Sequence, residues 1–290
     1  MHRILLLLAG IFLNFPGLLI GELINRPVVN IYLQPEEDTE IDSQAIYGSV
    51  VEIIDHVSDW SKIRTVDGVE GWVLSSQLVT NLSYENSDHL RPIKSLFACI
   101  YRVTDTTPYP PLLTIPYGSR VKLDETVDTG ERWVSMELLS GEKVWIQRGD
   151  VDFSPQFKTL EEVLSFSKKF LGLPYTWGGT SSYGFDCSGF MQMLFREMGL
   201  QLPRNSRDQA GCGLFTPVTQ EDLQPGDLVF FGKTRITHVG LYLGNDEFIH
   251  SGVTELPMVM ISNIKSGKYN FQAARRIDPL MVEAYRMNFR

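Results

Sequence analysis

An amphipathic helix is encoded in the second half of the chain. Four apolar residues recur at spacings of three, one and four, which is the period of one buried helix face: Phe190, Met193, Leu194 and Met198. Gly199 ends the pattern, as glycine often does just after a helix. The pattern therefore predicts a helix that begins close to Cys187, directly after a turn-rich run over residues 174–179.

Two strands are predicted farther along the chain, over residues 237–243 and 247–251. The sequence Gly244-Asn245-Asp246 between them is typical of a hairpin turn. A turn centred on Asn245 pairs residues whose numbers sum to 490.

This register places two of the five histidines near each other. His238 and His250 sum to 488, so they are diagonal neighbours on one face of the hairpin, roughly 7–8 Å apart. A slip of one residue would move them to opposite faces, and the sequence alone does not exclude that slip.

The first half of the chain contains an internal repeat, over residues 25–80 and 90–152. Each copy has a Tyr-Gly-Ser turn and two tryptophans 12 residues apart, Trp60 with Trp72 and Trp133 with Trp145. Short alternating strands separated by glycine turns predict two small β-barrels. Residues 81–86 are expected to link the barrels, and a third domain is expected over residues 155–290.

Composition restricts the classes of function. The chain has 290 residues, 43% of them hydrophobic, a net charge of −9 and no basic cluster, which argues against nucleic acid as a partner. The three cysteines, Cys99, Cys187 and Cys212, form no disulfide framework and no zinc-ligand spacing. We therefore expect neither a metal nor another cofactor.

The N-terminus suggests export. Arg3 precedes an apolar run over residues 4–13, which suits a secretory signal within residues 1–24. No clear cleavage site of small residues follows, so an uncleaved membrane anchor is the alternative. Either form predicts a periplasmic or extracellular protein.

Cys187 is the strongest candidate for chemistry. A thiol in the first turn of a helix faces the positive end of the helix dipole, and this position predicts a lowered thiol pKa. The same position also suits a small buried core cysteine. His238 as a base, and His250 orienting that base, would complete a thiol-acyl-transfer arrangement.

Several motifs carry a resemblance to a known family. They span Pro174–Ser251 and read PYTWGG, FDCSGF, LQPGDLVFF, THVGLYLG and FIHS. This set resembles the NlpC-type cell-wall peptidases, which are papain-like cysteine hydrolases, and the repeats resemble bacterial SH3-like domains. The resemblance implies an α+β protein with two small SH3-like β-barrels followed by a papain-like cysteine peptidase domain. It assigns Cys187 as nucleophile, His238 as base and His250 as third residue.

The resemblance also implies a substrate, the stem peptide of peptidoglycan, cut between D-glutamate and a diamino acid. Five residues are candidates for binding it: Tyr175, Trp177, Asp186, Ser188 and Ser206. Asp186 equally suits the cap of the helix. Two alternatives stay open, an amidase or acyltransferase on the same fold, and a wall-binding protein whose enzyme domain is inactive. The first barrel either anchors the protein to the wall or closes the site around stems with a free amine.

Overall fold

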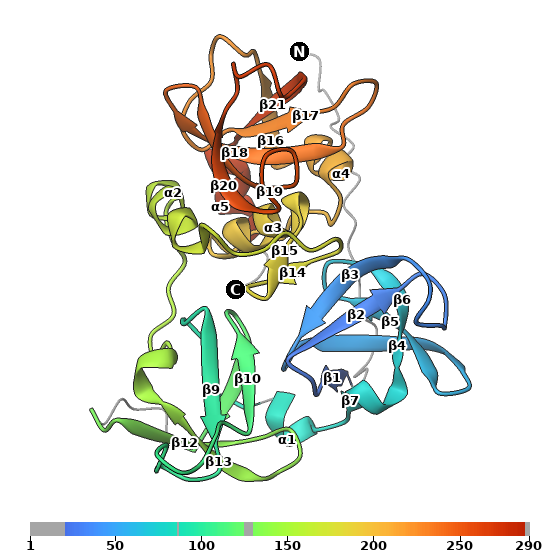
Figure 1. The fold of residues 1–290 in the computed structure, drawn as a ribbon, viewed down its shortest axis with the longest axis vertical. Coiled ribbons are helices and arrows are strands. Elements are labelled where there is room, and N and C mark those ends of the chain that lie inside the picture. Colours follow the sequence, from blue (N-terminus) through green and yellow to red (C-terminus); the bar gives the residue numbers. More distant parts are fainter. Residues whose placement is uncertain (1–20, 86, 125–129, 288–290) are drawn as a thin grey trace, which may run out of the picture.

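The structure is a computed structural model that describes residues 21–85, 87–124 and 130–287. Its parts are two β-barrels and a larger domain that carries three longer helices (Figure 1). Residues 1–20 of the signal sequence or anchor predicted over residues 1–24 lie outside the described residues. Within the described residues, no helix is long and apolar enough to cross a membrane.

The first barrel is an antiparallel sheet with the strand order β3-β2-β6-β5-β4-β1-β7. Its strands are β1 (Glu22–Ile24), β2 (Val28–Tyr32), β3 (Ile41–Ile46), β4 (Val50–Val57), β5 (Trp60–Thr65), β6 (Glu70–Leu74) and β7 (Leu78–Val79). The predicted leader ends at residue 24, but residues Glu22–Ile24 form strand β1 of this sheet. Leu23 and Ile24 are both buried, because Ile24 packs in the core of the first barrel and Leu23 packs in the hydrophobic cluster of the second barrel.

The second barrel has the strand order β10-β9-β13-β12-β11-β8. Its strands are β8 (Leu90–Pro92), β9 (Phe97–Tyr101), β10 (Leu113–Pro116), β11 (Arg120–Leu123), β12 (Trp133–Glu137) and β13 (Lys143–Gln147). A tyrosine packs edge-on against the first tryptophan of each repeat, with ring centroids 5.6 Å apart for Tyr32 and Trp60 and 5.4 Å for Tyr101 and Trp133. This shared packing is what two copies of one unit would show.

The segment between the barrels is more than a linker. It contains the short helix α1 (Leu82–Glu85), and Tyr84 on that helix is fully buried. The Tyr84 hydroxyl donates a hydrogen bond to the carbonyl of Arg120 at 2.9 Å. The segment is therefore tied into the second barrel.

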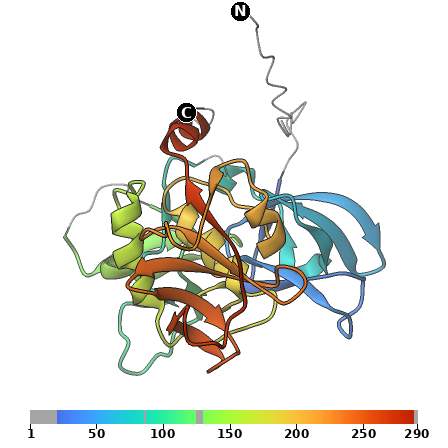
Figure 2. The same cartoon turned by 90° about the horizontal axis from the view of Figure 1, so that it is seen from above.

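The third domain packs helices against an antiparallel sheet with the order β16-β21-β17-β18-β19-β20. Its helices are α2 (Leu160–Ser167), α3 (Cys187–Arg196), α4 (Ser206–Ala210) and α5 (Pro279–Met287). Its strands are β14 (Thr180–Ser181), β15 (Gly184–Phe185), β16 (Phe215–Val218), β17 (Leu228–Phe231), β18 (His238–Gly244), β19 (Glu247–Gly252), β20 (Met258–Asn263) and β21 (Phe271–Ile277). Viewed from above, α5 projects from the opposite side to the hairpin β18–β19 (Figure 2).

Helix α3 forms because its apolar face matches the sheet beneath it and its first turn is capped. Asp186 is the cap, and its Oδ1 accepts the backbone N–H of Gly189 at 2.7 Å. The predicted stripe of four apolar residues is buried in the core, although Met198 lies two residues beyond the last helical residue, Arg196. Gly199 then takes a positive φ of 78°, where glycine is favoured.

The hairpin β18–β19 has the predicted register. Leu241 pairs with Ile249 and Tyr242 with Phe248, so both pairs sum to 490. Asn245 and Asp246 both have positive φ, as a two-residue turn of type I′ requires. The turn itself pairs Gly244 with Glu247, which sum to 491, and an irregularity between Tyr242 and Gly244 shifts the register to 490. The turn and this irregularity together therefore set which residues share a face.

The hairpin β14–β15 lies against both barrels (Figure 1). On the side of the first barrel, the Thr180 hydroxyl donates to the carbonyl of Gln44 at 3.1 Å. On the side of the second, the Tyr183 hydroxyl donates to the carbonyl of Thr114 at 2.6 Å. Because this hairpin directly precedes Cys187, both barrels help to fix the loop that leads to the thiol.

Candidate active site

Cys187 is the first residue of α3, and only 9% of its surface is exposed. Burial raises the pKa of its thiol to about 12, and the nearby Asp186 carboxylate acts in the same direction. The backbone N–H groups of Val239 and Ser188 oppose the rise without cancelling it. The prediction of a lowered thiol pKa is therefore wrong, because desolvation outweighs the effect of the helix start.

The two histidines meet as the hairpin register requires. His238 Nε2 and His250 Nδ1 are 2.9 Å apart, and the ring planes are nearly perpendicular. Gly252 lies beside both rings, and a methyl group at this position would approach His250 Nδ1 to 2.8 Å. The absence of a side chain at Gly252 thus makes room for the pair.

Both imidazoles are neutral at pH 7. Burial lowers the pKa of His238 to about 4, although the charge of Asp186 opposes this shift. Burial, followed by the proximity of His238, lowers the pKa of His250 to about 3. Because Nε2 of His238 is engaged by His250, its Nδ1 is the ring nitrogen left to accept a proton.

Asp186 belongs to a buried polar cluster. Arg204 forms an ion pair with its carboxylate, and the Arg204 and Asp186 side chains are only 4% and 12% exposed. The Ser188 hydroxyl donates to Asp186 Oδ1 at 3.1 Å and accepts from Arg204 at 3.0 Å. Arg204 in turn donates to the hydroxyl of Ser43, on the first barrel, at 2.9 Å. The cluster therefore joins the helix start to the neighbouring domain.

A second contact from the first barrel lies close to this cluster. Gln192 on α3 donates to the Asp67 carboxylate at 2.9 Å. The charge of Asp67 also acts on Arg204. The first barrel thus contacts α3 through Asp67 in the β5–β6 turn, and it contacts Arg204 through Ser43 on β3.

Of the three further candidates, Tyr175 is the one whose hydroxyl interacts with Cys187. Tyr175 is half-buried, and burial together with the charges of Cys187 and Asp186 raises the pKa of its hydroxyl to about 12. It is therefore a hydrogen-bond donor near Cys187 at neutral pH. Trp177 is 61% exposed, and Ser206 begins α4. Gln209, three residues later, donates to the carbonyl of Ser188 at 3.0 Å and ties this helix to α3.

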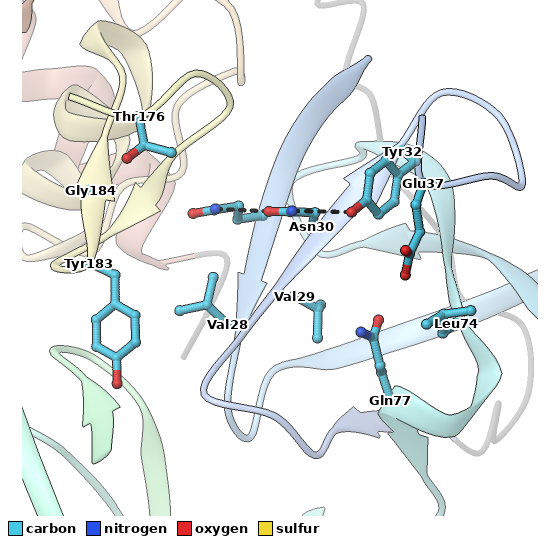
Figure 3. Close-up of a pocket in the computed structure, with 11 residues that line it drawn as sticks. Val28, Val29, Asn30, Tyr32, Glu37, Leu74, Gln77, Thr176, Tyr183 and Gly184 are labelled. Carbon is cyan, nitrogen blue, oxygen red and sulfur yellow. Dashed lines mark hydrogen bonds between the residues drawn. The ribbon is translucent and has the colours of Figure 1, made fainter. Parts of the chain in front are cut away.

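A cavity of about 260 Å³ lies between the first barrel and the loop that carries Tyr175 and Trp177 (Figure 3). Polar side chains supply much of its lining, including Asn30, which donates to the Tyr32 hydroxyl at 3.3 Å. Thr176 and Tyr183 contribute to its other wall. Neither Cys187 nor a histidine lines it, so it borders the candidate site without containing it.

Comparison with known proteins identifies the family. A model of the NlpC/P60 family matches residues 172–275, and a model of the bacterial dipeptidyl-peptidase SH3 domain matches residues 31–78. A gamma-D-glutamyl-L-lysine dipeptidyl-peptidase of Bacillus cereus is 30% identical over 265 residues, covering 83% of this chain and 76% of that protein. The chain belongs to the NlpC/P60 family. It is an NlpC/P60 cysteine peptidase preceded by an SH3-like domain, as the motifs predict.

Two further relatives support the assignment of this NlpC/P60 peptidase. A gamma-D-glutamyl-L-lysine dipeptidyl-peptidase of Bacillus subtilis is 29% identical over 255 residues, which is 84% of this chain and 83% of that protein. The crystal structure of an NlpC/P60 family protein from Bacillus cereus superimposes with a TM-score of 0.78 at 26% identity. The match covers 89% of this chain and 100% of that one.

Sequence reasoning missed two structural features of this NlpC/P60 site. Arg204 pairs with Asp186, and its signal was its place two residues before Ser206 in an R-x-S-x-x-Q segment. Gly252 accommodates the histidine pair, and its signal was its place two residues after His250. Among the described residues, no group of histidine, cysteine and acidic side chains is arranged to hold a metal ion.

Proposed function

We propose that this protein is a cysteine endopeptidase that hydrolyses the bond between D-glutamate and a diamino acid in peptidoglycan stem peptides. The observation that carries the proposal is the placement of Cys187, His238 and His250 at the start of α3 and on one face of the β18–β19 hairpin. Relatives that align over most of the chain are named for action on gamma-D-glutamyl-L-lysine. A substrate in the cell wall agrees with the predicted export.

The reaction begins with a neutral thiol and a neutral imidazole. His238 Nδ1 takes the thiol proton as the sulfur of Cys187 attacks the γ-carbonyl of D-glutamate. Backbone N–H groups at the start of α3 and the Tyr175 hydroxyl stabilise the oxyanion. His238 then protonates the leaving amine, and water releases the acyl group from sulfur.

The first barrel also shapes the substrate site in this proposal. It contributes Asp67 beside the ion pair of Asp186 and Arg204. Two carboxylates and one guanidinium sum to a formal charge of −1, which suits the ammonium of a free N-terminal alanine. Because Arg204 already pairs with Asp186, the ammonium would join an existing ion pair, with Ser188 as a further partner.

The test compares L-Ala-γ-D-Glu-L-Lys with the same peptide acetylated at its N-terminus. We expect the free amine to be strongly preferred, and we expect Asp67→Asn to reduce this preference. Asp59→Asn, which changes an exposed carboxylate of the same barrel, is the matched control. Equal rates of the wild-type protein on both peptides would leave the barrels as wall anchors. Mass spectrometry of the products would show whether a different bond breaks, as in an amidase.

A further inference from the structure

The hydrogen bonds of the active site continue beyond His250. Its Nε2 lies 3.0 Å from the hydroxyl of Ser262 on β20, and that hydroxyl donates to Glu255 Oε1 at 2.8 Å. Lys268 holds the other carboxylate oxygen of Glu255 at 2.8 Å. His250 and Ser262 are both buried, so water does not compete freely for the bond between them, whereas Glu255 lies at the surface.

The carboxylate gives this chain of bonds a direction. An ionised carboxylate only accepts hydrogen bonds, so Ser262 donates its proton to Glu255. The Ser262 oxygen then accepts the proton on His250 Nε2. His250 Nδ1 consequently carries a lone pair, which accepts the proton on His238 Nε2. This leaves the lone pair of His238 on Nδ1, where a base is needed.

We propose that Glu255 is a positioning residue that acts through Ser262 to fix the tautomers of His250 and His238. The inference rests on the proposed role of His238 as the base. The negative charge of Glu255 acts on His250, whose pKa it raises against the effect of burial. The histidine pair thus has a carboxylate on the side of His250.

Two neighbouring groups support this role of Glu255. The Tyr269 hydroxyl lies 3.3 Å from Glu255 Oε1 and 3.4 Å from His250 Nε2, so it can donate to the same carboxylate. Hydrogen bonds from Lys268 and Ser262 lower the pKa of Glu255, which keeps it ionised at neutral pH.

The test measures kcat and KM on a defined stem peptide for Glu255→Gln, Ser262→Ala and the double variant. A glutamine amide can donate to Ser262, which permits the reversed chain of bonds and the unproductive tautomer of His238. We expect each single variant to lower kcat about tenfold, below the ~10²–10⁴-fold range of losing a general base, with KM nearly unchanged. Because both residues act through the same chain of hydrogen bonds, the double variant should have about the same kcat as either single variant.

The matched control is Asp246→Asn. Asp246 is also a carboxylate paired with a lysine, Lys265, at 2.9 Å, but it lies at the turn of the hairpin. The kcat of the Asp246→Asn variant should equal that of the wild type. Nitrogen NMR of the histidines should show the proton of His250 on Nε2 in the wild type. In Glu255→Gln it should show a mixture of the Nε2-protonated and Nδ1-protonated tautomers.

Three results would overturn the proposal: an unchanged kcat in Glu255→Gln, losses that multiply in the double variant, or identical tautomers in both proteins. These results are distinguishable from failure of the proposed function, since that failure would appear as an inactive wild-type protein on the same peptide.

Discussion

Replacing Gly252 by alanine should separate catalytic geometry from stability. The backbone of Gly252 does not lie in the positive-φ region that favours glycine, so an alanine is compatible with the strand. The added methyl would lie 2.8 Å from His250 Nδ1, 2.9 Å from His250 Cε1 and 3.3 Å from His238 Cε1. The added methyl would therefore displace the rings of His250 and His238, to which we assign catalytic roles.

The size of the effect follows from the distances. Ordinary contacts of such a methyl begin at 3.4 Å, so the nearest ring atom must move by 3.4 − 2.8 = 0.6 Å. The strand cannot easily move instead, because β19 pairs with β18 on one side and with β20 on the other. Misplacement by about 1 Å can cost roughly 10²-fold in rate. We therefore expect kcat to fall by about 10-fold to 100-fold.

The assay is the initial rate of amine release from L-Ala-γ-D-Glu-L-Lys, with thermal unfolding measured in parallel. Gly213→Ala is the control, since a methyl there would meet no atom within 4 Å. It should keep full activity, and both variants should unfold within a few degrees of the wild type. A Gly252→Ala protein with wild-type kcat would refute the argument that displacing the histidine rings slows turnover.

The remaining predictions concern the catalytic residues themselves. Cys187→Ala should remove hydrolysis while circular dichroism shows an intact fold, and residual turnover above background would argue against the nucleophile. His238→Ala should lower kcat more than His250→Ala, because a base is harder to replace by water than an orienting residue; equal losses in steady-state kinetics would contradict these roles. The acid limb of the kcat/KM profile should lie well below the ordinary histidine pKa of about 6.5, because burial lowers the pKa of His238 to about 4. An acid limb of the kcat/KM profile at or above pH 6.5 would contradict the low pKa of His238. For the same reason, the free energy of unfolding should fall as pH drops from about 6.5 toward 4, because the unfolded chain binds the proton more readily than the native protein in this range.

The local patterns of the sequence determined the parts of this site that depend on neighbouring residues. The spacing of Phe190, Met193 and Leu194 predicts helix α3, because a helix repeats every 3.6 residues, but the pattern of one buried face is wrong, since the structure buries all residues of α3 except Arg196. The turn predicts the hairpin, and its register of 490, reached through an irregularity between Tyr242 and Gly244, brings His238 beside His250. The equal spacing of tryptophans predicts the duplicated barrels. The domain boundaries beyond the first strand and the roles of the site residues stay predictions: catalysis by Cys187, His238 and His250, and substrate binding by Tyr175, Trp177, Asp186, Ser188 and Ser206.

Only the tertiary structure decided what surrounds these residues. Ser43 approaches Arg204 across 161 positions of the chain, and no local period encodes such a contact. The approach of Glu255 to His250 through Ser262 likewise depends on how β20 and its preceding loop pack. Burial also reversed the expected shift in the pKa of Cys187, since desolvation depends on everything packed around the sulfur. The sequence therefore predicts which groups react, whereas long-range packing sets their protonation and determines which groups orient them.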